Sequence, residues 1–109
     1  MIIGLDYDGT FTSDPFLWME FYWNCIERGH TIFVITMRYE SEIDTMEPGL
    51  VKVAQIFFTG RKAKRSFMLS KGIKIDVWID DHPEAVTMDA DQIWPTIAPE
   101  GQPVVPVYD

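Results

Sequence analysis

The chain has 109 residues and a formal net charge of −8, with nine Lys and Arg against seventeen Asp and Glu. This length suits one domain with one core, so we expect a single domain over residues 1–109. The acidic balance argues against nucleic acid as a bulk partner, because such binding needs Lys and Arg to displace counterions from phosphates.

Hydrophobic residues make up 47% of the sequence, which is enough for a packed core. The single cysteine, Cys25, excludes an internal disulfide. No apolar run approaches the length that spans a bilayer, and no leader-like segment precedes the first apolar run. We therefore expect a cytoplasmic protein with no membrane partner.

The first apolar run, residues 2–5, ends at two aspartates, Asp6 and Asp8, and then at Gly9. Because the run is continuously apolar, it predicts a central strand buried on both faces. A chain that turns at Gly9 lets both carboxylates converge beyond the strand, where they repel unless a hard cation such as Mg²⁺ lies between them. One interpretation is therefore a metal-assisted phosphate site, and the other is a solvated turn.

Residues 15–28 form the next predicted element, a helix. Asp14 followed by Pro15 is a typical helix start, and Gly29 is a typical stop. The helix is apolar and aromatic outside one narrow polar stripe. This pattern indicates either a deeply buried core helix or a surface that contacts another subunit in a homo-oligomer.

The apolar residues 31–35 predict a second strand, parallel to the first through a right-handed crossover. Thr36 and Arg38 follow this strand. Ligands bind beyond the carboxyl ends of parallel strands, so both side chains are expected near the turn at Asp6 and Asp8. A simple ion pair between Arg38 and a nearby Glu is the alternative.

Residues 39–46 are a short acidic helical candidate, which we expect Pro48 and Gly49 to end, and residues 51–58 predict the third strand. A helix over residues 61–71 follows. Its opening turns are crowded with cations, although the positive end of the helix dipole prefers anions. A bound phosphate would explain this cluster, and a solvated charged face is the alternative. The cations are Arg61, Lys62, Lys64 and Arg65.

Residues 73–79 predict the fourth strand, which ends at Asp80 and Asp81, and Pro83 opens a short helix over residues 84–87. The remaining residues are rich in proline, and residues 104–108 predict no more than an edge strand. These elements predict an α/β fold, a three-layer Rossmann-like parallel sheet of about five strands with helices on both faces.

Four short motifs now resemble those of a known family. The run Asp6-Tyr-Asp-Gly-Thr10 resembles the DxDGT signature of the haloacid dehalogenase-like (HAD) superfamily of phosphohydrolases. Residues 34–36 are similar to its second motif, Lys62 or Lys64 to its third, and residues 79–81 to its fourth, in the family's order. The short intervals between the motifs hold no cap domain. The chain is thus similar to the small capless HAD-like hydrolases of phages and bacteria.

The resemblance implies that Mg²⁺ is the cofactor and that Asp6 is a nucleophile forming an aspartyl-phosphate. It implies that Asp8 is the general acid and base, and that its carbonyl also binds the metal. Asp80 would complete the metal shell, and Asp81 would support it directly or through water. Ile79 stands where the fourth motif often has Gly, a departure that leaves the acids unchanged.

The resemblance also implies a set of phosphate-binding residues. Thr36 and a lysine would contact the phosphoryl group, and Lys64 is the preferred lysine with Lys62 as the alternative. Arg38, from its position beyond the second strand, and Gly9, in the turn after the first, complete the predicted phosphate-binding set.

The leading function is Mg²⁺-dependent hydrolysis of a phosphomonoester, with a nucleotide or small phosphometabolite as substrate. One alternative is a catalytically silent module that binds metal and phosphate. The presence of both Asp6 and Asp8 argues against it, because a module without turnover does not need the second acid. Another is a phosphatase of a phosphorylated macromolecule or nucleic-acid end. A response-regulator receiver domain needs an Asp after the third strand, where Thr59 stands, and a P-loop nucleotidase needs Lys where Thr10 stands.

Overall fold

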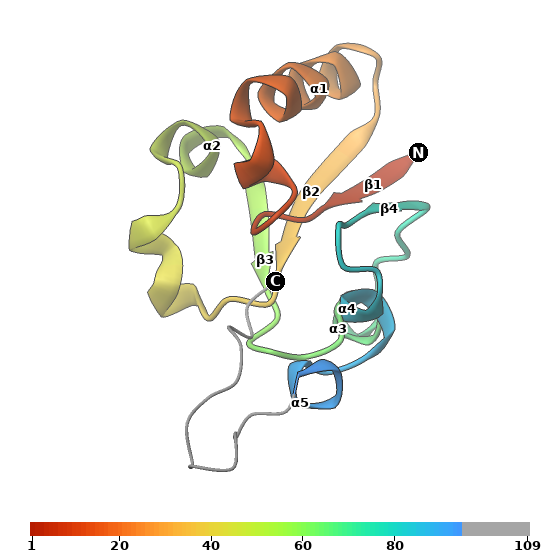
Figure 1. Ribbon diagram of the computed structural model, residues 1–109. Coiled ribbons are helices and arrows are strands. Elements are labelled where there is room, and N and C mark those ends of the chain that lie inside the picture. Colours follow the sequence, from red (N-terminus) through yellow and green to blue (C-terminus); the bar gives the residue numbers. More distant parts are fainter. Residues whose placement is uncertain (95–109) are drawn as a thin grey trace.

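The computed structural model describes residues 1–94 of the chain, so the edge strand expected at residues 104–108 lies outside the described part. This part is an α/β domain with a four-stranded, all-parallel sheet in the order β3-β2-β1-β4 (Figure 1). The strands are β1 (Ile2–Leu5), β2 (Thr31–Thr36), β3 (Gln55–Phe58) and β4 (Val77–Ile79). The sheet confirms the expected parallel α/β arrangement and places β1 between β2 and β4.

Helix α1 (Pro15–Glu27) confirms the predicted start and stop signals. The Asp14 side chain accepts a hydrogen bond from the Leu17 N–H at 3.2 Å, Pro15 is the first helical residue, and Gly29 follows the helix with a φ of +82°. Only Tyr22 and Cys25 of this helix are buried, so α1 is not a deeply buried core helix. Phe16 is 90% exposed, and contact with a second copy through this face stays a prediction.

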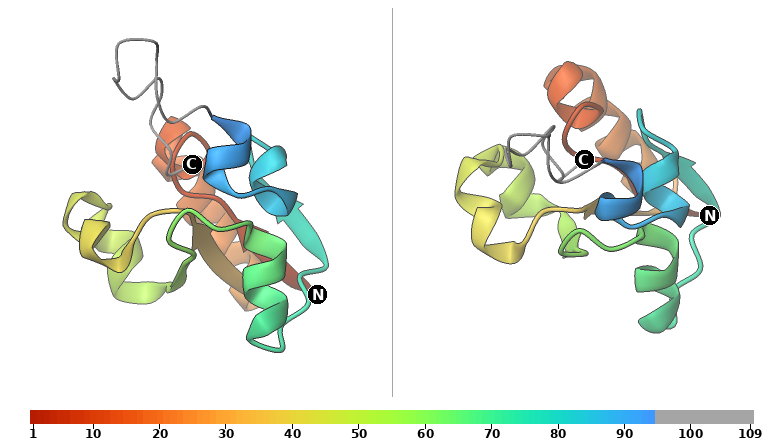
Figure 2. Two further views of the ribbon diagram at one scale, coloured as in Figure 1. Left: turned by 90° about the horizontal axis from the view of Figure 1, so that it is seen from below. Right: turned by 60° about the horizontal axis from the view of Figure 1, so that its bottom comes forward.

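Side chains that alternate along β2 enter two separate hydrophobic clusters. Ile32 and Val34 pack in the cluster that includes Tyr22 of α1. Ile35 packs in the other cluster with Met68, which belongs to α3 (Lys64–Ser70). The right-hand view of Figure 2 accordingly shows α1 and α3 on opposite sides of the strands. Because apolar side chains cover both faces of β2, the strand has the continuous hydrophobic sequence expected of a central parallel strand.

The segment before β3 corrects the sequence-based prediction. Pro48 and Gly49 do not end an element; they open helix α2 (Pro48–Val53), in which Pro48 is the first residue. The Glu47 side chain accepts a hydrogen bond from the Gly49 N–H at 3.1 Å and so caps this helix. The predicted strand over residues 51–58 is therefore wrong in its first half, and β3 covers only residues 55–58. Residues 40–45, a predicted helix, form a 3-10 helix (Glu40–Thr45).

The later elements are shorter than expected. Helix α3 begins at Lys64, because the preceding turn carries Gly60 and Arg61 at positive φ. Residues 73–76 are not in a strand, and β4 begins at Val77, after the Asp76 carboxylate accepts a hydrogen bond from the Ile2 N–H at 2.7 Å. Helix α4 (Glu84–Thr87) is as predicted, while α5 (Ala90–Ile93) was not predicted. Within the described residues, no helix has the length and apolar character needed to cross a membrane.

Candidate metal and phosphate site

Three carboxylates meet where β1 and β4 end. Asp6 follows β1 and is 2% exposed, and its N–H donates to the Ile79 carbonyl at 2.9 Å, which extends the pairing of the two strands. Asp80 and Asp81 follow β4. One carboxylate oxygen of each of the three residues lies within 4.8 Å of the other two. We call Asp6, Asp80 and Asp81 the acidic cluster; it joins residues from both ends of the described chain because parallel neighbours end at the same edge.

Lys64 brings its ammonium group into the acidic cluster. Its Nζ lies 2.7 Å from Asp6 Oδ1 and 2.6 Å from Asp80 Oδ2, and its side chain is 1% exposed. Burial by itself would lower the pKa of Lys64, but the charges of Asp6 and Asp80 and the hydrogen bonds to both outweigh it and raise that pKa above its usual value. Lys64 is therefore held as a cation between two carboxylates.

Lys62 lies elsewhere. Its side chain is 70% exposed, and its Nζ is 4.0 Å from Asp89 Oδ2. Asp89 also accepts a hydrogen bond from the Ala63 N–H at 2.7 Å, which anchors the residue just before α3. The structure thus brings Lys64, and not Lys62, to the acids, because Lys64 starts the helix while Lys62 stays in the exposed turn before it.

Thr10 and Gly9 bring the turn after β1 against Asp81. The Thr10 hydroxyl donates to Asp81 Oδ1 at 3.0 Å and accepts from the Asp81 N–H at 3.0 Å. Gly9 has a φ of +87°, and a Cβ at this position would collide with the Asp81 carboxylate. Glycine is needed here for both reasons, since it permits the left-handed backbone and the close approach. Together these contacts fix the direction of one carboxylate of the acidic cluster.

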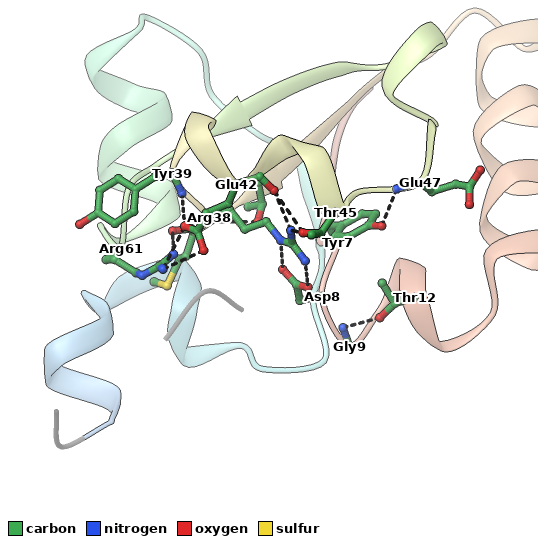
Figure 3. Close-up of polar contacts among 12 residues, drawn as sticks. Tyr7, Asp8, Gly9, Thr12, Arg38, Tyr39, Glu42, Thr45, Glu47 and Arg61 are labelled. Carbon is green, nitrogen blue, oxygen red and sulfur yellow. Dashed lines mark hydrogen bonds and ion pairs between the residues drawn. The ribbon is translucent and has the colours of Figure 1, made fainter. Parts of the chain in front are cut away.

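Asp8, two residues after Asp6, has a different partner. Its carboxylate accepts two hydrogen bonds from Arg38, from Nε at 2.8 Å and from NH2 at 2.8 Å (Figure 3). The structure therefore does not bring the Asp8 side chain into the acidic cluster. The hydrogen bond to Asp8 raises the pKa of Arg38; burial opposes this rise, and the charge of Asp8 adds to it.

Thr36 is the last residue of β2 and is fully buried. Its hydroxyl accepts a hydrogen bond from the Arg38 N–H at 3.2 Å, so it shapes the turn that carries Arg38. Gly9, the other residue expected at a phosphate, donates its N–H to Thr12 Oγ1 at 2.9 Å (Figure 3). Thr36 therefore ends β2 beside the turn that carries Arg38, and Gly9 lies in the turn that follows β1.

Sequence reasoning did not identify a second ion pair beside Arg38. Arg61 lies 2.9 Å from the Glu42 carboxylate and donates to the Met37 carbonyl at 2.9 Å, and its guanidinium lies over the Tyr39 ring at 4.7 Å (Figure 3). Burial by itself would raise the pKa of Glu42, but hydrogen bonds from Arg61 and from the Tyr39 N–H outweigh it and lower that pKa. The sequence places Arg61 in the predicted cation cluster after Gly60, a common turn residue, but nothing in the sequence indicates Glu42 as its partner. Arg61 has a φ of +72°.

The acidic cluster has the donor set of a hard divalent cation. All three candidate ligands are carboxylate oxygens, which suit Mg²⁺ better than they suit softer metals. In the described contacts, the Lys64 ammonium is the cation beside the three carboxylates of the acidic cluster, so the cluster has an excess of negative charge. The residues present therefore fit a Mg²⁺ ion, which would leave room among its ligands for water and a phosphate oxygen.

Comparisons with family models, with curated proteins and with solved structures find no match to this chain. A function must therefore follow from the side chains themselves. The two features that any function has to explain are the acidic cluster with Lys64 and the separate pairing of Asp8 with Arg38.

Proposed function

We propose that this chain is a Mg²⁺-dependent phosphatase with a capless, three-layer HAD-like core, which hydrolyses phosphomonoesters through an aspartyl-phosphate on Asp6. The observation that carries this proposal is the Lys64 ammonium, 1% exposed and within 2.7 Å of both Asp6 and Asp80, beside Asp81. Burying a cation among clustered carboxylates costs free energy, and such arrangements are found at functional sites. The function proposed here is to bind a phosphoryl group together with Mg²⁺, which offsets the excess negative charge.

Asp6 supplies the nucleophile. Its carboxylate oxygen forms a bond to phosphorus while the bond from phosphorus to the ester oxygen breaks, and the leaving oxygen takes the electron pair. Lys64, bonded to Asp6, fixes the direction of the attacking carboxylate and faces the charge that develops on the phosphoryl oxygens. When bound, Mg²⁺ supplies the positive charge that offsets repulsion between the phosphate and the carboxylates.

Asp8 carries the proton transfers. It donates a proton to the leaving oxygen in the first step and takes one from water in the second, when water attacks the aspartyl-phosphate and returns Asp6 to its free carboxylate. Thr36, at the end of β2, and Gly9, in the turn after β1, supply polar groups near the phosphate. The substrate class we propose is a nucleotide or small phosphometabolite, and a phosphorylated macromolecule or nucleic-acid end is the alternative for an open site.

A second candidate function is a silent module that binds metal and phosphate without turnover. The observation that favours it is the pairing of Asp8 with Arg38, because a guanidinium that donates to both oxygens favours the charged carboxylate, and one of these hydrogen bonds has to break before Asp8 can hold a proton. The two candidates differ in turnover and agree in metal binding. A cytoplasmic setting belongs to both proposals and suits the free, buried thiol of Cys25.

Hydrolysis of para-nitrophenyl phosphate, with Mg²⁺ and with a chelator, tests the proposal. We expect turnover that requires Mg²⁺, and a loss of at least about a thousandfold in Asp6→Asn, which keeps the side-chain shape but removes the nucleophile. Asp91→Asn, at an exposed position in α5, is the matched control and should keep full activity. Full activity in Asp6→Asn would disprove the nucleophile, whereas a wild type that binds Mg²⁺ without turnover would favour the silent module.

A further inference from the structure

Arg38 forms the most complete set of polar contacts near the proposed active site. Its guanidinium meets the Asp8 carboxylate at two points, Nε to Oδ2 and NH2 to Oδ1, both at 2.8 Å. A two-point contact fixes the plane and direction of the carboxylate as well as its distance, which a single hydrogen bond does not. The Asp8 side chain is 18% exposed, so solvent reaches it. The two-point contact with Arg38 is therefore what sets the direction of its carboxylate.

The guanidinium itself is held in place from the other side. Its NH1 donates to the Glu42 carbonyl at 2.8 Å and to Thr45 Oγ1 at 2.6 Å, and its centre lies 5.2 Å from the Tyr7 ring (Figure 3). The Arg38 side chain is 10% exposed. These contacts come from the 3-10 helix of residues 40–45 and from the turn after β1, so Arg38 connects that helix to Asp8.

This arrangement differs from that of a residue that binds phosphate directly. The hydrogen bonds from the Arg38 side chain to Asp8, Glu42 and Thr45 engage all three nitrogens of its guanidinium. A plain surface ion pair would also fit poorly, because such pairs are exposed and make few further contacts. The geometry instead describes a rigid support for one carboxyl group.

We propose that Arg38 is a positioning residue, which holds the Asp8 carboxyl in the direction from which it delivers a proton to the leaving oxygen. This inference rests on the proposed function. In the step concerned, Asp8 carries its proton on one oxygen, which has released its hydrogen bond from Arg38, while the other oxygen keeps its hydrogen bond. The phosphorus–oxygen bond of the ester breaks, its electron pair goes to the leaving oxygen, and the Asp8 proton moves to that oxygen. Arg38 therefore acts through Asp8 and not on the phosphate.

Leaving groups of different basicity separate these roles. The leaving oxygen of para-nitrophenyl phosphate departs with little help from an acid, whereas that of a simple alkyl phosphate needs a proton. We therefore measure kcat/KM, which reports the steps up to transfer of the phosphoryl group to Asp6, for both esters in the Mg²⁺-loaded protein. In Arg38→Ala we expect a loss of about tenfold or less on the aryl ester and at least about a hundredfold on the alkyl ester.

Arg61→Ala is the matched control. Arg61 also holds the 3-10 helix through Glu42, but its described contacts do not include Asp8. Any loss caused only by loosening this helix should therefore appear in both arginine variants and should be equal for the two esters. Arg38→Lys covers the case in which Arg38→Ala folds poorly, because lysine keeps the charge and the stem but cannot make the two-point contact. It should show the same dependence on the leaving group, to a smaller extent.

A double-mutant cycle with Asp8→Asn completes the test. If Arg38 acts through Asp8, then Arg38→Ala should cost nothing further on the alkyl ester once Asp8 has been replaced. Equal losses on both esters, or a loss that persists in the Asp8→Asn background, would overturn the inference and identify Arg38 as a phosphate ligand or a purely structural residue. A wild type that hydrolyses neither ester would instead overturn the proposed function, and this inference with it.

Discussion

Two aspartates at the end of β1 lie in opposite charge environments. Asp6 belongs to the acidic cluster, where one ammonium faces three carboxylates, while Asp8, two residues later, faces a guanidinium whose fork matches both of its oxygens. The first environment has an excess of negative charge that a divalent ion would neutralise. The second is balanced by the protein alone. Adjacent acids can therefore acquire different tasks through the cation that each one meets.

The choice of cation follows this division. Lysine offers a compact charge that two carboxylates can share, as Asp6 and Asp80 do, and arginine offers a planar fork that fixes the direction of one carboxylate. The contrast leads to a graded set of expectations. Changes in the acidic cluster should have large effects on turnover and metal binding, and changes in the contacts around Glu42 should have small ones.

The largest effect is expected from Lys64→Met, which keeps the length of the side chain and removes its charge. Asp6 and Asp80 are then left as buried carboxylates without their ammonium, so the free energy of unfolding should fall by about 3–5 kcal/mol without Mg²⁺. Turnover of an aryl phosphate should fall at least about a hundredfold. Chemical denaturation and steady-state kinetics measure the two effects.

Lys62→Met is the control for this change, because Lys62 is exposed and lies two residues before Lys64, in the turn that precedes α3. Its stability and turnover should stay close to those of the wild type. Equal losses in the two variants would mean that stability and turnover depend on the total positive charge near the start of α3, and not on the contact between Lys64 and the acids.

Asp81→Asn should have an intermediate effect, which thermal unfolding with and without Mg²⁺ detects. At about 100 times its Kd an ion stabilises a protein by about 2.7 kcal/mol, and a tenfold weaker affinity reduces that gain by about 1.4 kcal/mol. We expect at least this reduction, whether Asp81 binds the ion directly or through water. Asp44→Asn, at an exposed position of residues 40–45, should leave the Mg²⁺ effect unchanged. An unchanged effect in Asp81→Asn would remove Asp81 from the metal site.

Glu42→Gln should have the smallest effect and a definite dependence on pH. Because the pKa of Glu42 is lower in the folded protein than its ordinary value of 4.5, its contribution to stability is present above that value and is lost as the pH falls through the lowered pKa. At neutral pH we expect the variant to lose about 1 kcal/mol or less, and in stronger acid we expect no difference from the wild type.

Denaturation at several pH values compares Glu42→Gln with Glu40→Gln, an exposed neighbour in the same 3-10 helix. Mg²⁺ binding should be the same in both. A loss that persists unchanged in strong acid would mean that Glu42 stabilises the helix by packing and not by its charge.

Local signals made much of this fold predictable. Continuous apolar residues predict β1 and β2, and the pair Asp14 and Pro15 predicts the start of α1. The structure has all three elements at these positions. Pro48 shows the limit of such signals, since a proline can follow the end of one helix or begin the next. Here Pro48 begins α2, because the Glu47 side chain caps that helix. The late start of β4 was not predictable in the same way. Ile75 is apolar because it packs in the hydrophobic cluster with Met68, although it lies before the strand begins.

The candidate site was predictable only where strand ends define it. Asp6, Asp80 and Asp81 follow strands that end at one edge, so parallel pairing alone places them together. The position of Arg38 beyond β2 predicted that it lies near the turn at Asp6 and Asp8, and its contact with Asp8 confirms this. Strand ends alone did not decide between Asp8 and a nearby Glu as its partner, because that choice depends on the path of the turn after β2. For the same reason the choice between Lys62 and Lys64 needed the exact first residue of α3, the kind of boundary that sequence patterns define least well.

Pairing between β1 and β4 joins segments from the two ends of the described chain, in a register that sets Ile3 beside Val77. Closing so long a loop is slower than forming local contacts, so we expect β4 to dock late when the protein folds. Asp80 and Asp81 then join Asp6 only when β4 docks. Capture of Mg²⁺ would mark the completion of folding, and release of the ion would be an early sign that the edge of the sheet has begun to open.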